Sequence, residues 1–491
     1  MGVIIRQSAR NLIFNYGGFA LGAFNTLVLM PRYLSREQIG VLNTFTSYSW
    51  ILATICLFGM PLVIVRFYPA TEGIQRRQLI QSAATLPLLL AITAALAGLL
   101  FPQLVTLVVP NPEPIFLRYH SWIFFMVIMH VAFEIVAAIL RSELRTAPPV
   151  FWREVFLRVF NLVLYLAYGA GLFDYSMLVG GFALSSAVLL LGLISHVRSK
   201  IGFNPGLHFK KEWLKYGSYN LIGASLVFVV YQLDIVMLHR YGYLNLIAVY
   251  TIAMFMASTI QLPFRAFSVV AVPVLAKAFA AHDLKQVGQI YRRSSEVMLV
   301  AGGALSLWIL WCAEDFRYFL PADYRPHLVA PLGFLVLAKW LDMAMGLNGA
   351  IINQSHHYKF DIWANLILLA TALVFNVLLI PSMGVPGAAL ATCISVFLYN
   401  VVRYVYIIFR LGIHGFGWNA LHIALFYVIS WWTLTRISFS GHPVALIFLK
   451  TVITALLVGI WIWVLKPSRE VWVLFQNTIK SLKNTEIKNL F

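Results

Sequence analysis

The feature that most constrains the fold is a long succession of apolar segments separated by short polar turns. Runs of about 18 or more apolar residues are typical of transmembrane helices. Hydrophobic residues make up 61% of the 491 residues and charged residues only 11%, whereas soluble domains have roughly 45–50% and about 25%. This composition excludes a water-soluble enzyme, a disordered chain and a disulfide scaffold.

Fourteen membrane spans are predicted from these segments, and no loop between them is long enough for a folded extramembrane domain. We therefore predict an all-α polytopic membrane protein. The predicted spans cover residues 11–31, 41–65, 79–101, 119–140, 155–173, 176–196, 217–239, 246–275, 294–312, 327–348, 362–381, 384–409, 418–435 and 444–465.

The distribution of basic residues predicts the topology. The net charge is +18, from 36 Lys and Arg against 18 Asp and Glu. A soluble protein with this charge would suggest a nucleic-acid partner. Here most of the Lys and Arg fall in alternate connecting segments, which is the pattern of cytoplasmic loops. We therefore expect no nucleic-acid partner and a multi-pass protein of the inner (plasma) membrane with both termini in the cytoplasm.

Several kinds of site are not expected. Cys56, Cys312 and Cys393 lie in or beside apolar stretches and form no CxxC pair, so neither a zinc site nor a disulfide is predicted. No GxxxxGK[ST] phosphate-binding loop occurs in the chain, which argues against an ATP-driven pump. We expect no cofactor, no metal site and no catalytic residues, so the protein is not predicted to be an enzyme.

The chain also repeats itself with a constant offset of 208 residues. In that register the matching positions are Arg32–Tyr33 with Arg240–Tyr241, Glu134 with Asp342, and Thr26 with Asp234. These matches predict two pseudo-symmetric six-helix lobes, residues 1–212 and 213–415. Two additional helices then lie in residues 416–466, and a cytoplasmic interfacial tail follows in residues 467–491. Repeats of this kind place a transporter's substrate site between the halves.

A helical hairpin carries the most specific motif of the chain. It reads Ile380-Pro381-Ser382-Met383-Gly384-Val385-Pro386-Gly387-Ala388-Ala389-Leu390-Ala391-Thr392. We expect Pro381 to end its first helix, Gly384 and Gly387 to permit a tight turn, and the small residues to let the backbones pack closely. Two further segments belong to the same pattern, residues 31–40 and Gln261–Pro263.

These three segments resemble the polysaccharide exporters of the multidrug/oligosaccharidyl-lipid/polysaccharide exporter superfamily. The resemblance implies two six-helix lobes in a V shape around a central cavity. It also implies a flippase that moves an undecaprenyl-diphosphate-linked or related lipid-linked oligosaccharide from the inner to the outer leaflet, for cell-surface polysaccharide or lipopolysaccharide biosynthesis. The implied partners are the lipid-linked glycan, membrane lipids, and glycan polymerases or glycosyltransferases of the same pathway.

Two other functions stay open. A cation-coupled multidrug antiporter of the same superfamily would usually have a more acidic cavity and no spans 13 and 14. A membrane-embedded glycan polymerase or acyltransferase would need a catalytic loop or a His/Asp constellation at a membrane face. The cations within the spans, Arg265 and Lys339, favour an anionic substrate over a cationic drug. The outer loop around Glu314 to Arg325 is short, which argues against the enzyme.

Charged groups inside spans are costly, at about 2.5–3.5 kcal/mol each on insertion scales, so each is a candidate functional residue. A lipid diphosphate needs cationic partners in a wet cavity, and arginine binds phosphate with two donors. Arg265 is the first candidate, because Pro263 and Pro273 should distort its span. The predicted cationic cavity is formed by Arg265, Lys339, Arg66 and Arg403.

The buried acids are candidates for energy coupling by a proton or cation. They are Asp234, Glu134 and Asp342. Three structural alternatives remain beside these roles: Glu134 pairs with Arg265, Lys339 neutralises Asp342 three residues along the same helix, or Asp234 makes an inter-lobe hydrogen bond. Lys450, in the last span, is a further candidate for a lipid-binding groove.

Overall fold

The fold is given by a computed structural model that describes residues 2–101, 103–197, 206, 208, 210–437, 439–468, 471–473 and 476. All the regular structure in these residues is helical, which confirms the all-α class. The chain divides into two compact units: unit 1 is Met1–Ile252 with Ala372–Ala388, and unit 2 is Ala253–Thr371 with Ala389–Phe491. Most of the predicted interfacial tail lies outside the described residues.

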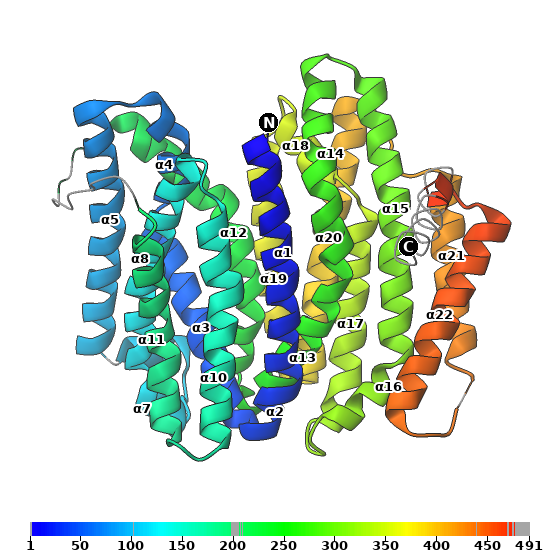
Figure 1. The fold of residues 1–491 in the computed structure, drawn as a ribbon, viewed down its shortest axis with the longest axis horizontal. Helices are drawn as coiled ribbons and strands as arrows, with labels where there is room; N and C mark the ends of the chain where they lie inside the picture. The colour runs from blue at the N-terminus through cyan, green and yellow to red at the C-terminus, as the bar shows by residue number, and fades with distance from the viewer. Residues whose placement is uncertain are drawn as a thin grey trace, which may run out of the picture. The chain divides into compact units, whose positions relative to one another are not determined.

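Unit 1 holds the helices of the first half of the chain together with α12 and most of α13. Its helices are α1 (Gly2–Phe24), η1 (Asn25–Leu29), α2 (Met30–Tyr33), α3 (Arg36–Leu57), α4 (Met60–Phe67), η2 (Tyr68–Ala70), α5 (Gly73–Leu100), α6 (Gln103–Val108), α7 (Pro114–Tyr119), α8 (Ser121–Ser142), α9 (Ala147–Val150), η3 (Phe151–Phe156), α10 (Leu157–Gly169), α11 (Tyr175–Ile194), α12 (Lys211–Arg240) and α13 (Leu244–Ser258). At its centre α8 packs against α3, α5 and α11, and α3 also packs against α12 (Figure 1).

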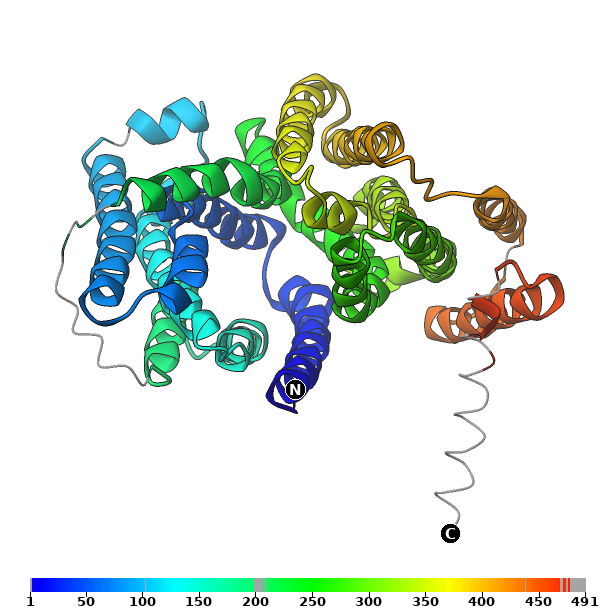
Figure 2. The same cartoon turned by 90° about the horizontal axis from the view of Figure 1, so that it is seen from above.

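Unit 2 is built around α15. Its helices are η4 (Thr259–Gln261), α14 (Leu262–Ala280), α15 (Leu284–Trp311), α16 (Ala313–Phe316), η5 (Arg317–Phe319), α17 (Arg325–Ala344), α18 (Asn348–Gln354), α21 (Trp418–Leu434) and α22 (Pro443–Leu465). The first half of α19 (Phe360–Met383) and all but the first turn of α20 (Val385–Leu411) belong to unit 2, and the segment Ala372–Ala388 between these parts belongs to unit 1. Figure 2 shows most helices of both units end-on.

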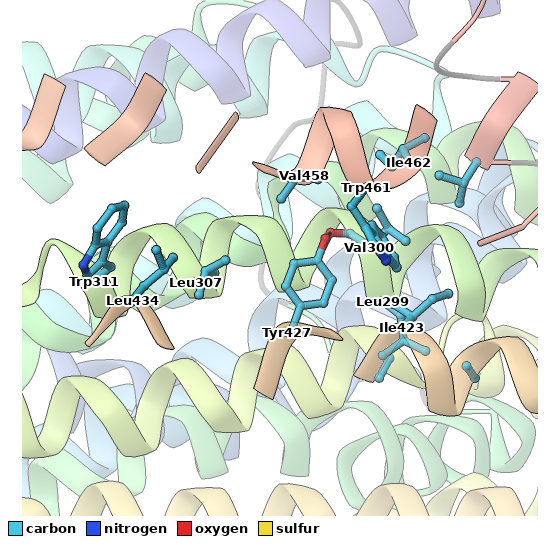
Figure 3. Packing of buried hydrophobic residues seen from close by; sticks show 13 residues of the cluster. Leu299, Val300, Leu307, Trp311, Ile423, Tyr427, Leu434, Val458, Trp461 and Ile462 are labelled. Atoms are coloured by element: carbon cyan, nitrogen blue, oxygen red, sulfur yellow. Dashed lines mark hydrogen bonds between the residues drawn. The ribbon is translucent and has the colours of Figure 1, made fainter. Parts of the chain in front are cut away.

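The two added helices, α21 and α22, pack on α15 through a buried apolar cluster. Leu299, Val300 and Leu307 of α15 contact Ile423 and Tyr427 of α21 together with Trp461 of α22 (Figure 3). The Tyr427 hydroxyl donates to the Val300 carbonyl oxygen at 2.8 Å, so its polar end is satisfied inside the cluster.

Eleven of the described helices are long and apolar enough to cross a membrane, and the chain is a multi-pass membrane protein. The other predicted spans, residues 155–173, 217–239 and 418–435, coincide with α10, α12 and α21, which fall outside that set. The total of fourteen therefore stays a prediction. The division into units 1 and 2 also differs from the predicted boundary after residue 212, and the two-lobe repeat stays a prediction as well.

The second predicted span is interrupted. Ser35 caps the N-terminus of α3 with a capping box. Its side-chain oxygen accepts a hydrogen bond from the Gln38 backbone N–H, and the Gln38 side-chain oxygen accepts one from the Ser35 backbone N–H. The helix ends at Phe58 and Gly59, both in the left-handed region with φ of 49° and 69°. Pro61 then begins α4 near its first turn, where proline is favoured. The predicted span over residues 41–65 therefore contains two helices, of which Arg36–Leu57 is long and apolar enough to cross a membrane.

The hairpin of α19 and α20 has the predicted tight turn, with one correction. Gly384 has φ of 61°, a conformation that side chains rarely adopt. A Cβ on Gly387 would overlap the Leu379 carbonyl oxygen, so only glycine fits. Pro381 does not end the helix, because α19 continues to Met383. The turn glycine terminates the helix instead.

Candidate functional site

A buried carboxylate in unit 1 forms the first polar site. Asp234 on α12 is 2% exposed. It accepts a hydrogen bond from the Tyr250 hydroxyl of α13 and one of 2.9 Å from the Asn376 amide nitrogen of α19. The Asn376 side-chain oxygen is buried and has no partner among the described residues. The site therefore combines a carboxylate with an open amide oxygen, and oxygen atoms are the ligands that hard cations prefer.

Glu134 on α8 lies in a second, fully paired cluster of unit 1. Its carboxylate accepts from Arg153 of η3 at 2.5 Å and from Arg141 at 3.1 Å. Glu134 keeps only 12% of its side chain exposed, while the two arginines are about a third exposed. Two cations thus neutralise this carboxylate inside its own unit. Ion pairing of this kind favours a structural role for Glu134.

Asp342 on α17 is the predicted coupling acid that lies in unit 2. Uncharged side-chain amides donate hydrogen bonds to its carboxylate. The Gln261 amide nitrogen donates to one oxygen at 2.9 Å, and the Asn400 amide nitrogen donates to the other at 3.0 Å. Asn400 in turn accepts from Asn348 at 2.8 Å. This chain of amides joins η4, α17, α18 and α20. Lys339, one turn before Asp342, is 5% exposed.

The four predicted cations differ in their surroundings. In unit 2, Arg403 on α20 is 8% exposed, donates to the Asp361 carboxylate, and lies 4.1 Å from the Tyr399 ring centroid. Arg265 on α14 is exposed. In unit 1, Arg66 at the end of α4 is exposed and lies 4.4 Å from the Tyr216 ring centroid. The single cavity that these residues are predicted to line stays a prediction.

Each unit also contains a large apolar pocket. In unit 1 a pocket of about 430 Å³ lies between α3, α5, α7, α8 and α12. In unit 2 a pocket of about 450 Å³ lies between α15, α17 and α21, with Gly333, Phe334 and Trp431 among its walls. Both pockets are of the size range of small-molecule sites, and their walls suit a hydrocarbon chain.

Lys450 is part of a buried ion pair. Its ammonium on α22 donates to the Asp315 carboxylate of α16 at 2.5 Å and to the Trp311 carbonyl oxygen at 3.0 Å. Both charged side chains are 10% exposed. The contacts anchor α22 to α16, so the lipid-groove role expected for Lys450 is not supported.

No protein-family model and no curated protein matches the chain. Solved structures do match it. The structure titled lipid II flippase MurJ, inward closed conformation, has a TM-score of 0.77 at 14% identity, over 95% of this chain and 99% of its own. An inward-facing MATE multidrug resistance transporter has a TM-score of 0.64 at 16% identity, over 83% and 98%. A superfamily transporter from Pyrococcus furiosus, described as having a binding pocket of reverse polarity, has a TM-score of 0.57 at 16% identity, over 84% and 95%.

The chain has the fold of the multidrug/oligosaccharidyl-lipid/polysaccharide exporter superfamily. The resemblance predicted from the hairpin is thereby confirmed at the level of the superfamily fold. The matched structures are transporters and flippases.

Within this exporter fold, several polar residues of the sites were not predicted. They are Tyr250, Asn348, Asp361, Asn376 and Asn400, together with Gln261, which was noted only as part of the segment Gln261–Pro263. Most are neutral, and the search for costly charges inside spans passed over them. Asn or Gln within an otherwise apolar run is the signal that finds them, because a buried amide needs partners. Among the described residues, no cluster of three His, Cys, Asp or Glu side chains suits a metal ion.

Proposed function

We propose that this protein is a flippase that moves an undecaprenyl-diphosphate-linked oligosaccharide from the inner to the outer leaflet by alternating access. The observation that carries the proposal is the extent of the structural match. The lipid II flippase matches 95% of the chain, whereas the MATE multidrug transporters match 83–84%. A match of 95% must include part of the region of α21 and α22, which the sequence predicts to lie outside the repeat.

The cations inside the spans support an anionic substrate. Lys339 and Arg403 are buried despite the cost of placing charge there. We infer that Arg265, Lys339, Arg66 and Arg403 line a cavity that receives the diphosphate. Arg403 is held by Asp361, so a diphosphate would compete with a carboxylate for its guanidinium group. The exposed Arg265 needs no such exchange and is the first residue to test.

The apolar pockets support a lipid-linked substrate. A substrate carried on a polyprenyl chain needs apolar surface as well as a cationic site. The pocket between α15, α17 and α21 offers that surface. We infer a pathway role in cell-surface polysaccharide biosynthesis at the plasma membrane, with both termini in the cytoplasm and the glycan-assembling enzymes as partners.

Energy coupling is proposed at Asp234. A buried carboxylate changes its charge when it binds a proton or a cation, and that change favours one conformation over another. The unpartnered oxygen of Asn376 supports this role, because it is free to coordinate a cation beside the carboxylate. Glu134 and Asp342 are the remaining acids proposed for coupling. Glu134 is the weaker of the two, since two arginines already neutralise it.

The test uses proteoliposomes that contain a fluorescent undecaprenyl-diphosphate-linked disaccharide, with an impermeant quencher outside. The wild-type protein is expected to make the inner-leaflet probe accessible to the quencher. Arg265→Ala is expected to slow this at least tenfold, while Lys285→Ala, an exposed cation at the start of α15, leaves it unchanged. Efflux of a cationic dye without flipping of the probe would instead establish the multidrug antiporter.

A further inference from the structure

A small, partly enclosed cavity lies inside unit 1. It has a volume of about 70 Å³ and lies between α3, α8, η3, α10 and α11. Its polar walls are Thr46, His130, Arg153, Asn161, Ser185 and Ser186. Liquid water occupies about 30 Å³ per molecule, so the cavity holds about two water molecules.

Two buried side chains at this cavity lack hydrogen-bond partners. His130 on α8 is 8% exposed, and its Nδ1 atom has no partner among the described residues. The Oδ1 atom of Asn161 on α10 is buried and is likewise unpartnered within the described part of the chain. Buried polar atoms are nearly always hydrogen-bonded. These two atoms therefore need a group that fills the space between the helices.

The hydroxyl groups of the cavity are available only as acceptors. Ser185 donates to the Phe182 carbonyl oxygen at 2.6 Å, and Ser186 donates to that of Ala183 at 2.6 Å. Thr46 donates to the carbonyl oxygen of Leu42 at 2.9 Å. Each hydroxyl proton is thus bonded within its own helix, while the oxygen lone pairs remain. The lining is rich in acceptors and needs a donor.

The charged groups around the cavity are better suited to binding water and a proton than to binding a metal ion. The cavity lining described by the structure includes the guanidinium group of Arg153 and no carboxylate. Arg153 is bound to Glu134 at 2.5 Å and lies 4.0 Å from Glu154. Glu134 is also bound by Arg141. The residues that α3, α10 and α11 contribute to the lining are uncharged. A metal cation would therefore find no carboxylate ligand in the described lining.

We propose that this cavity is a hydrated proton-binding site in which His130 takes up the proton. Histidine is the side chain that changes charge between about pH 5 and 8, and no other residue of the lining does so. One turn along α8, Glu134 lies on the same face, and its carboxylate is already bound by Arg141 and Arg153. The His130 ring is stacked on Trp50, with centroids 4.2 Å apart and planes 13° apart. That arrangement is favourable to a cationic ring. Protonated His130 donates from Nδ1 to water or to Asn161, which satisfies both unpartnered atoms.

The direct test follows exchange of the histidine C2 proton for deuterium by mass spectrometry, in the full-length protein in nanodiscs. This exchange rate depends on the protonation state of each histidine. His130 is expected to give a sigmoidal dependence on pH between about 4 and 9, with the exposed His422 as the reference in the same sample. A rate for His130 that does not change over this range would overturn the proposal.

A second variant tests the water-filled cavity itself. Asn161→Leu removes the acceptor and fills the space, so the midpoint of the His130 exchange curve is expected to fall by about one pH unit, which corresponds to one hydrogen bond. An unchanged midpoint would mean that the cavity does not contribute. Both measurements are independent of transport, so they decide the site even if the lipid-linked probe is not flipped.

The functional consequence is measured with the same proteoliposomes. His130→Gln keeps a polar side chain but cannot titrate, and it is expected to flatten the pH dependence of flipping over the pH range in which the His130 exchange curve changes. His422→Gln is the matched control and is expected to keep the wild-type profile. If His130→Gln keeps the wild-type pH profile, proton binding at His130 is not linked to transport.

Discussion

At the scale of single residues, the predicted charges and their partners differ in how far the sequence reveals them. Asp234, Lys339 and Arg403 are all buried, as expected for ionisable groups in spans. Their partners come from distant parts of the chain: Asn376 lies 142 positions from Asp234, and Asp361 lies 42 from Arg403. Pairing over such distances depends on tertiary packing. The sequence therefore identifies Asp234, Lys339 and Arg403 as charged residues of a site, but it does not identify the residues that bind them.

Asp234→Asn tests the coupling role. The substitution keeps the size of the side chain and an acceptor for Tyr250, and it removes the charge. Flipping of the lipid-linked probe is expected to lose its dependence on pH or Na⁺, with normal insertion. The measurement is the initial rate in proteoliposomes over a range of pH and Na⁺ concentrations. Retention of the wild-type dependence would make Asp234 a structural residue, and the search for coupling would move to Asp342.

At the scale of helices, the turn of the hairpin was predictable from local chemistry. The glycines at 384 and 387 and the small residues after them require a close turn, and the structure has one. The end of α3 was not predicted, because Phe58 adopts a left-handed conformation that its residue type does not suggest. Proline was also misjudged: Pro381 lies inside α19, in its last turn, and the helix continues past it to Met383. Local signals thus predict glycine turns better than proline breaks.

Gly387→Ala is expected to destabilise the α19–α20 hairpin. The added Cβ would overlap the Leu379 carbonyl oxygen, and overpacking of this kind costs about 1–3 kcal/mol. Gly459→Ala in α22 is the control, because nothing lies within 4 Å of its added Cβ and alanine favours the helix by up to about 1 kcal/mol. Thermal unfolding in detergent should show a lower midpoint for the first variant only. Equal midpoints would mean that the hairpin relaxes.

The Lys450–Asp315 pair is expected to hold α22 in place. Lys450→Ala leaves a buried carboxylate unpaired, and breaking a buried pair costs about 3–5 kcal/mol. The double variant Lys450→Met with Asp315→Leu is expected to recover most of the lost stability, because no charge is then left uncompensated. The measurement is the midpoint temperature of thermal unfolding for the wild-type protein, the single variant and the double variant. A double variant as unstable as Lys450→Ala would mean that the ionic contact itself is required.

At the scale of the whole molecule, composition and the hairpin motif were enough to predict the all-α class and the superfamily fold. Both follow from signals that survive low sequence identity: apolar runs set by the thickness of the membrane, and a glycine turn that tolerates no side chain. The substrate does not follow from either signal. It depends on which cations share a cavity and on where apolar surface remains, and those are properties of the packed helices.

Truncation after Gly412 tests what α21 and α22 contribute to the whole protein. The MATE multidrug transporter structures match 83–84% of the chain, so we expect the shortened protein to insert and to remain folded. The shortened protein is expected to lose flipping specifically. Its pocket of about 450 Å³ lacks the wall formed by Tyr427, Val428 and Trp431, and flipping of the lipid-linked probe should fall at least tenfold. Monodisperse elution in detergent serves as the control for folding. A truncated protein that flips the probe at the wild-type rate would show that the lipid chain is bound elsewhere, and the argument from the added helices would then no longer separate a flippase from a drug antiporter.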